Sequence, residues 1–304
     1  MLFDKKLLEE KLQDFTGKLL FDEPMAKHTT FRIGGAADCI AYPACIDDIR
    51  AVYRAAEELS LEVTVLGNGS NVLVSDDGIR GIVLCFDASF ADIRLEGNQI
   101  IVQSGAILGA VSQFAAQNSL SGLEFAVGIP GSMGGAIFMN AGAYDGEMKN
   151  VVREVTALTS NGDVKVYRAD ELELGYRYSI FQDNGEIICE IKLELVSGNI
   201  EQIKEKMAGF TEKRISKQPL ELPSAGSTFK RPPGMFAGTL IEQAGLKGFS
   251  VGGAQVSEKH AGFVVNKGGA TAADVLTLIS EVQRIVKEKF DVNLQPEVRI
   301  LGGK

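Results

Sequence analysis

The sequence predicts an α+β fold, and three features of this chain of 304 residues indicate it. Apolar residues recur at helical spacing over 47–59 and 272–290, which is typical of amphipathic helices. Asn161 and Gly162 separate two β-type segments, a strong signal for an antiparallel hairpin. A run rich in Val and Leu at 61–66 ends directly in glycines, as a buried strand before a loop does.

The other elements are expected from the same periodicities. Leu7, Leu8, Leu12 and Phe15 have helical spacing, so a short amphipathic helix is expected over 4–16. Changes of pattern near 87 and near 199 divide the chain into three parts, 1–87, 88–198 and 199–304. Further helices are expected over 108–118, 200–215 and 239–244, and strands over 72–74, 81–86, 99–104, 151–159, 163–167, 187–196, 261–265 and 292–301.

Composition and charge exclude several classes of protein. The net charge of −9 argues against general nucleic-acid binding, which requires a basic face. Cys39, Cys45, Cys85 and Cys189 are scattered without C-x-x-C spacing, so neither a zinc site nor a disulfide framework is expected. No apolar run reaches the length of a signal peptide or a membrane span. We therefore expect a cytoplasmic protein without a bound metal.

Two glycine-rich loops, 67–71 and 128–136, each follow an apolar segment, and a third glycine-containing stretch follows at 140–144. Glycine admits positive φ and lets a ligand approach backbone amides, so such loops can bind a pyrophosphate without a basic side chain. A tight turn without a ligand is the alternative for either loop alone. The spacings match neither a Rossmann fingerprint nor a P-loop, so a cofactor of another type is expected.

Three polar residues are candidates for chemistry, although each also has an ordinary structural interpretation. Ser227 lies between small residues in a loop, and this fact alone favours a solvated turn serine. The surrounding sequence does not fit the G-x-S-x-G elbow of a serine hydrolase. With only His28 and His260 in the chain, a catalytic triad is weakly supported. Glu297 could be an edge glutamate, and Arg177 a surface or cation–π arginine.

Taken together, seven segments in this order resemble the MurB family, the UDP-N-acetylenolpyruvoylglucosamine reductases of peptidoglycan synthesis. The resemblance covers roughly residues 20 to 302, and several such motifs in one order are highly specific. The segments are KHTTFRIGGAAD (27–38), LGNGSNVLVSDDG (66–78), GIPGSMGGAIFMNAGAYDGEM (128–148), LGYRYSIF (174–181), PSAGSTFKRP (223–232), AGLKGFSVGGAQVSEKHAGFVVN (244–266) and LQPEVRILG (294–302).

The resemblance implies a vanillyl-alcohol-oxidase-like (PCMH-type) FAD-binding region in two subdomains, 1–87 and 88–198, followed by a C-terminal α/β substrate domain, 199–304. FAD is expected to be bound non-covalently, because the histidine linkage site of covalent relatives is missing. The implied cofactor contacts are Gly67, Asn68, Gly69, Ser70, Asn71, Gly128, Ile129, Pro130, Gly131, Ser132, Gly134, Gly135, Asn140 and Gly142.

The implied reaction is NADPH-dependent reduction of UDP-N-acetylglucosamine enolpyruvate to UDP-N-acetylmuramate. Ser227 matches the family's proton donor, a general acid. Arg177 and Glu297 match the pair that binds and polarises the substrate carboxylate, for which Glu297 has to be protonated or to have a close arginine partner.

Substrate contacts are implied for Lys217, His260, Lys267 and Arg299. Only 181–186 separates the arginine motif from the next strand, so the tyrosine-lid insertion of some members is absent and the chain resembles the shorter type. A monomer is expected. Two rivals remain: another FAD oxidoreductase of the same fold, which would lack the SAGSTFK and QPEVR motifs, and a non-catalytic nucleotide-sugar binding protein, which would be colourless.

Overall fold

The computed structural model describes residues 3–303, which form two compact units that interleave along the chain. The first unit contains the chain up to Leu20, then Cys39–Asn68 and Gly81–Arg214. The second contains Phe21–Asp38, Gly69–Arg80 and the chain from Ile215 onward. The division into 1–87, 88–198 and 199–304 stays a prediction.

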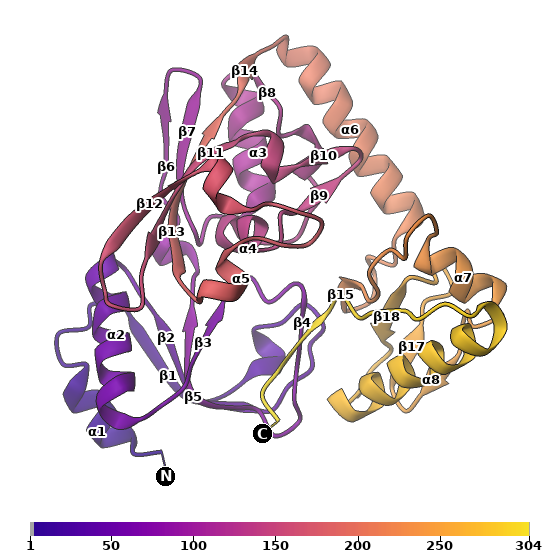
Figure 1. The fold of residues 1–304 in the computed structure, drawn as a ribbon, viewed down its shortest axis with the longest axis horizontal. Coiled ribbons are helices and arrows are strands. Elements are labelled where there is room, and N and C mark those ends of the chain that lie inside the picture. Colours follow the sequence, from indigo (N-terminus) through magenta and orange to yellow (C-terminus); the bar gives the residue numbers. More distant parts are fainter. Residues whose placement is uncertain (1–2, 304) are drawn as a thin grey trace. The chain divides into compact units, whose positions relative to one another are not determined.

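The first unit is built around a five-stranded antiparallel sheet with a helical layer on one face (Figure 1). Its strands, in spatial order, are β12 (Val164–Arg168), β11 (Val152–Leu158), β13 (Ile187–Glu194), β7 (Gln99–Gln103) and β6 (Ile93–Glu96). Helices α3 (Leu108–Gln117) and α4 (Met133–Phe138) bury their apolar side chains against this sheet. Gly162 has φ of +82° in the β11–β12 turn, which confirms the hairpin that Asn161 and Gly162 predict.

A four-stranded sheet follows the order β1-β2-β5-β3, and the division between the units runs through three of its strands. Its β3 and β5 pair in parallel, and helix α1 packs on helix α2. The Asp4 carboxylate caps α1 by accepting from the amides of Lys6 and Leu7. The bounds are β1 (Lys18–Pro24), β2 (Ala36–Tyr42), β3 (Val63–Leu66), β5 (Ile79–Cys85), α1 (Lys5–Lys11) and α2 (Ile46–Leu59).

The second unit contains a four-stranded sheet, two helices and a parallel strand pair. Its apolar core includes Phe31, Ile33 and Leu73 beside side chains from the C-terminal third of the sequence. Both segments 21–38 and 69–80 are therefore integral to this core. The elements are β15 (Ser224–Ser227), β18 (Phe263–Asn266), β17 (Ala254–Val256), β16 (Ser250–Val251), α7 (Ala237–Gln243), α8 (Ala272–Phe290), β4 (Val72–Val74) and β19 (Arg299–Leu301).

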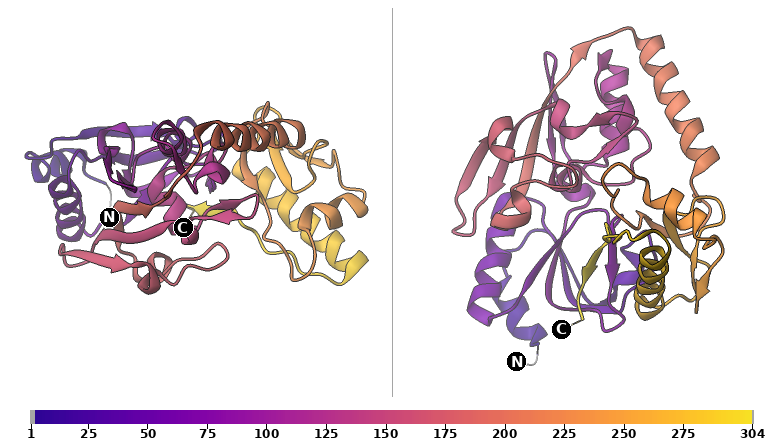
Figure 2. Two further views of the ribbon diagram at one scale, coloured as in Figure 1. Left: turned by 90° about the horizontal axis from the view of Figure 1, so that it is seen from above. Right: turned by 45° about the vertical axis from the view of Figure 1, so that its right-hand side comes forward.

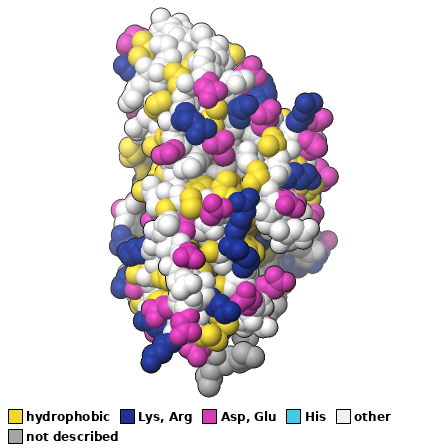
Figure 3. Space-filling model, turned by 90° about the vertical axis from the view of Figure 1, so that its left-hand side faces the viewer, with side chains coloured by type: hydrophobic (Ala, Val, Ile, Leu, Met, Phe, Trp, Pro, Cys, Tyr) yellow, Lys and Arg dark blue, Asp and Glu magenta, His cyan; other side chains and the backbone are white. Residues whose placement is uncertain are grey.

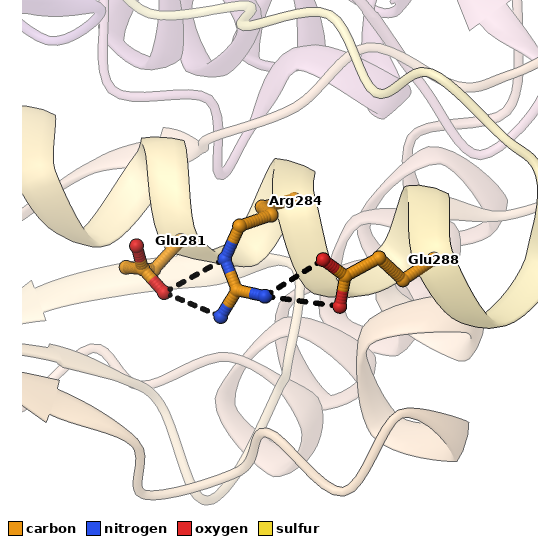
Figure 4. A network of polar contacts seen from close by, with 3 residues as sticks. All are labelled: Glu281, Arg284 and Glu288. Atoms are coloured by element: carbon orange, nitrogen blue, oxygen red, sulfur yellow. Dashed lines mark hydrogen bonds and ion pairs between the residues drawn. The ribbon is translucent and has the colours of Figure 1, made fainter.

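Helix α8 buries the apolar residues whose helical spacing predicts it from the sequence. Thr271 and Asp274 form a capping box at its start, and its apolar stripe is buried against β16, β17 and α7. The helix is drawn in yellow in both views of Figure 2. The exposed face carries Arg284, which pairs with Glu281 and Glu288 at 2.8 Å each (Figure 4). Both glutamates lie three or four positions away, so the network stabilises the helix surface locally.

The predicted helices 47–59, 108–118, 200–215 and 272–290 are confirmed, with ends that shift by at most two residues. The strand predicted over 292–301 is wrong for most of its length, since only Arg299–Leu301 forms β19. Pro296 has no amide to donate to a ladder, and it forms an isolated antiparallel bridge with Phe229 instead. The remaining strands and α-helices are β8 (Leu120–Ser121), β9 (Gly142–Ala143), β10 (Gly146–Glu147), β14 (Val196–Ser197), α5 (Phe181–Asn184) and α6 (Ile200–Lys217).

Acidic and basic side chains are interspersed on the face drawn in Figure 3, without a continuous basic surface. Among the helices of residues 3–303, none combines the length and apolar character that crossing a membrane requires.

Candidate functional site

The two glycine loops predicted to hold a cofactor meet in the first unit. Gly67 follows β3 directly, and a side chain at this position would collide with Oγ of Ser132. Ser132 is buried at the start of α4, where its hydroxyl caps the helix by accepting from the amide of Gly135 at 3.4 Å. The absence of a Cβ at Gly67 therefore allows the loops to touch, and positions far apart in the sequence become one local surface.

The first amides of α4 are already occupied by protein acceptors. Met133 donates to the carbonyl of Ala106 at 2.8 Å, and Gly134 donates to the carbonyl of Ser104 at 2.9 Å. The start of this helix is therefore not an open anion site. Within residues 3–303, by contrast, the amides of Asn68, Gly69 and Ser70 donate to no protein group. These amides are backbone donors that remain available to a ligand.

The second half of the same loop is held inside the second unit. Gly69 has φ of +58°, and a Cβ here would collide with the carbonyl of His28. The amide of Thr30 donates to the Gly69 carbonyl at 3.1 Å. Further on, Asn71 donates through Nδ2 to the carbonyl of Glu297 at 3.3 Å. The loop predicted to bind a cofactor is thus tied to a residue predicted to be catalytic.

Ser227 and Glu297 lie on neighbouring segments of the second unit. Ser227 ends β15 opposite Phe263 of β18, and its side chain is partly buried. The amide of Glu297 donates to the carbonyl of Thr228 at 2.8 Å, while the side chain of Glu297 is buried. Thr228 also accepts through Oγ1 from the amide of Val264 at 2.9 Å. The sequence analysis overlooked Thr228, whose contacts fix the register between these segments.

Arg177 belongs to the first unit and lies at the tip of a tight turn. The turn is closed by a bridge between Gly175 and Tyr178, and Arg177 has φ of +57°. A non-glycine residue in the left-handed region is strained, and such strain is common at functional sites. Gln182 stabilises the turn by donating to the Arg177 carbonyl at 3.0 Å, and the guanidinium carbon lies 5.4 Å from the centre of the Tyr176 ring.

The side chain of Asn140 connects this turn by hydrogen bonds to the segment 147–149. Its Nδ2 donates to the Gly175 carbonyl and to Glu147, both at 3.0 Å, while its Oδ1 accepts from the amide of Lys149 at 2.9 Å. Gly142 lies beside it in the short β9 strand, opposite Glu147. The predicted cofactor roles of Asn140 and Gly142 stay predictions, but the side chain of Asn140 has its hydrogen bonds within the protein.

The four predicted substrate contacts have different settings. Lys217, Lys267 and Arg299 are exposed, at the end of α6, after β18 and in β19. His260 is partly buried, its ring centre lies 5.0 Å from that of Phe263, and its Nδ1 accepts from the amide of Gly262 at 3.1 Å. Burial lowers the pKa of His260, so the neutral ring with its proton on Nε2 is favoured. These roles also stay predictions.

Comparison with known proteins places this geometry in a family. A family model described as "UDP-N-acetylenolpyruvoylglucosamine reductase, C-terminal domain" matches residues 218–301, and one described as "FAD binding domain" matches 37–167. A UDP-N-acetylenolpyruvoylglucosamine reductase of Clostridium perfringens is 53% identical over 281 residues, 92% of each chain. The chain belongs to the UDP-N-acetylenolpyruvoylglucosamine reductase (MurB) family.

Two further members of the MurB family support the assignment. The Geobacillus kaustophilus reductase is 51% identical over 295 residues, which cover 96% of this chain and 97% of that protein. The crystal structure of the Thermus caldophilus MurB has a TM-score of 0.81 at 36% identity, and covers 94% of this chain and 99% of that one. The α+β fold with an FAD-binding domain and a MurB-type C-terminal domain is thereby confirmed.

The residues of this chain fit the FAD that the MurB family uses. Gly67 and Gly69 leave no room for a side chain on the loop, and Asn68, Gly69 and Ser70 keep amides for a diphosphate. Backbone amides of this kind bind phosphate oxygens without a cation. The structure of this loop therefore agrees with an FAD-dependent oxidoreductase.

Proposed function

We propose that this chain reduces UDP-N-acetylglucosamine enolpyruvate to UDP-N-acetylmuramate with NADPH, in the synthesis of peptidoglycan precursors. The observation that carries the proposal is the backbone pairing of the Ser227 and Glu297 segments, together with the tie from Asn71 of the glycine loop to Glu297. The proposal includes a cytoplasmic location and a monomeric state.

Cofactor binding falls to the glycine loops in this proposal. Asn68, Gly69 and Ser70 would hold the diphosphate through their amides, and Ser132 would shape the surface beside Gly67. When bound, FAD supplies the site that accepts a hydride from NADPH and delivers it to the substrate vinyl group.

The substrate carboxylate is assigned to Arg177 and Glu297. A guanidinium binds a carboxylate through two parallel hydrogen bonds, and it stabilises the negative charge that grows there during reduction. Glu297 is a buried carboxyl group, which can donate a hydrogen bond to the substrate only in its protonated form.

Ser227 is assigned the final proton transfer. Its Oγ donates a proton to the substrate carbon next to the carboxylate, which completes the saturated lactyl ether. A serine hydroxyl is a very weak acid, so it can protonate only a strongly basic centre, and an enolate carbon is one. Lys217, His260, Lys267 and Arg299 are proposed to contact the nucleotide part of the substrate.

An anaerobic spectral titration of the purified protein tests the proposal. The flavin absorption near 450 nm, an approximate position typical of flavins, is expected to bleach with NADPH and to return when the enolpyruvyl substrate is added. A colourless protein that cannot be reconstituted with FAD would exclude the flavoenzyme. A yellow protein that only oxygen reoxidises would make it an oxidase of the same fold.

A further inference from the structure

Ser227 comes directly after a β-bulge in strand β15. Ser224 pairs with Val265 of β18, and Ser227 pairs with Phe263. Strand β15 therefore has one residue more than β18 between the two pairs. Gly226 lies within this bulge and has φ of +75°, in the left-handed region that glycine adopts without strain. Because a bulge changes the direction of the side chains next to it, the position of the Ser227 hydroxyl depends on how β15 is held on both sides of the bulge.

Backbone and side-chain hydrogen bonds hold the chain after the bulge. The amide of Thr228 donates to the carbonyl of Gly262 at 2.9 Å. The hydroxyl of Thr228 accepts from the amide of Val264, also at 2.9 Å. These contacts tie the residue that follows Ser227 firmly to β18.

The chain before the bulge has an outward-facing carbonyl. Strand β15 is at the edge of its sheet, with β18 on one side. The amide of Asn266 donates to the carbonyl of Pro223 at 2.9 Å, so this carbonyl points toward β18. Successive carbonyls of a strand point to opposite sides, and the carbonyl of Ser224 therefore points away from β18. It needs a partner from outside the sheet.

That partner is Thr30, which precedes Ser224 by 194 residues. The hydroxyl of Thr30 donates to the Ser224 carbonyl at 2.7 Å, while the amide of Thr30 donates to the Gly69 carbonyl at 3.1 Å. Oγ1 of Thr30 also lies 3.5 Å from the Gly69 carbonyl, but its single proton goes to the shorter contact. Thr30 thus joins the first glycine loop to the strand that carries Ser227.

We propose that Thr30 is a positioning residue for the final proton transfer. Its hydroxyl fixes β15 before the bulge, and so sets where Oγ of Ser227 lies relative to Gly69 of the glycine loop. Thr30 acts through the strand and does not have to touch the substrate. A displacement of about 1 Å in a reacting group can cost about a hundredfold in rate. The inference rests on the proposed function, because that function assigns the proton transfer to Ser227.

Thr30→Val tests the proposal, because valine keeps the shape of the side chain and removes the hydroxyl. Stopped-flow absorbance follows the two half-reactions separately. We expect reoxidation of the flavin by the enolpyruvyl substrate to slow by about tenfold to a hundredfold. Bleaching by NADPH and the KM for the substrate should be unchanged. Thr30→Ser keeps the hydroxyl and should retain most of the wild-type rate; a serine variant as slow as the valine variant would overturn the proposal.

Thr29→Val is the matched control, one position earlier. The Thr29 side chain is buried, and its hydroxyl donates to the carbonyl of Ile33 at 3.2 Å, within the same segment. This variant should leave both half-reactions unchanged, although denaturant unfolding can show a loss of stability. Equal slowing in Thr29→Val and Thr30→Val would overturn the proposal, because the cause would be a general loosening of the segment 27–38. Equal slowing of both half-reactions in Thr30→Val would also overturn it, since Thr30 would then act on the cofactor through Gly69.

A double-mutant cycle tests whether Thr30 acts through Ser227. In a Ser227→Ala background, Thr30→Val should have little further effect on reoxidation. Additive losses would contradict the proposed route through β15. A wild-type protein that the enolpyruvyl substrate does not reoxidise would overturn the proposed function itself. A normal wild type together with an unaffected Thr30→Val would overturn the role of Thr30 alone.

Discussion

The amide of Glu297 donates to the carbonyl of Thr228 at 2.8 Å, one residue after Ser227. The bridge between Phe229 and Pro296 continues this pairing. The spacing of the proposed proton donor and the proposed carboxyl partner is therefore fixed by the backbone. Side-chain substitutions at Ser227 or Glu297 leave that spacing intact, so their effects can be interpreted as chemistry.

Ser227→Ala should lower turnover by about a hundredfold to ten-thousandfold, the usual contribution of a general acid. Bleaching of the flavin by NADPH should be unchanged, because it needs no proton from this hydroxyl. Stopped-flow absorbance separates the two half-reactions. Ser227→Cys keeps a proton donor and should recover part of the rate; an alanine variant with near-normal reoxidation would remove Ser227 from the mechanism.

Gly67→Ala should destabilise the fold by about 1–3 kcal/mol, the cost of overpacking, and should weaken FAD binding. The new methyl group would be forced against Ser132. Urea unfolding and flavin titration measure the two effects. Gly209→Ala is the control, since it lies within α6 with open space around it and should be neutral or stabilising. Equal behaviour of both variants would contradict the contact between the loops.

Asp76→Ala should lower the free energy of unfolding by about 0.5–2 kcal/mol, the range for a lost helix cap. The Asp76 carboxylate accepts from the amides of Ala272 and Ala273, at 2.7 and 3.0 Å, at the start of α8. Denaturant unfolding measures the loss. Asp77→Ala, next to it and exposed, should change stability by less than about 0.5 kcal/mol.

His260 should make the protein less stable as pH falls below neutral. Burial lowers the pKa of His260 in the folded state, so the unfolded chain takes up this proton first, near its ordinary pKa of about 6.5. Stability is then lost from that pH down to the folded pKa and is constant for this group below it. Unfolding curves at several pH values should show a steeper decline for wild type than for His260→Gln; parallel curves would exclude the effect.

Local sequence patterns predicted the elements of this fold better than its contacts. The apolar periodicity of α2 and α8 and the Asn161-Gly162 turn are local signals, and they gave the right elements. The β19 strand is shorter than expected because the chain before it pairs with the segment at Phe229, a distant partner. No local pattern in the sequence shows with which segment a strand end will pair.

The same limit applies to the candidate site. The glycine loops, Ser227 and Glu297 were found from motifs, but the meeting of Gly67 with Ser132 depends on the folded chain. Arg214 resembles any charged residue of an amphipathic helix in the sequence. Its contact with Gly128, where a Cβ would lie 2.8 Å from Cδ of the arginine, becomes visible only in three dimensions.

The interleaving of the units along the chain determines which fragments of this protein keep an intact core. The second unit needs Phe31, Ile33 and Leu73 in its core, yet these precede most of the first unit in the chain. A fragment that begins at 199 would lack them and expose the apolar surface that they cover. The C-terminal region therefore cannot be exchanged between relatives by itself. A chimaeric protein should take 21–38 and 69–80 from the same parent as this region.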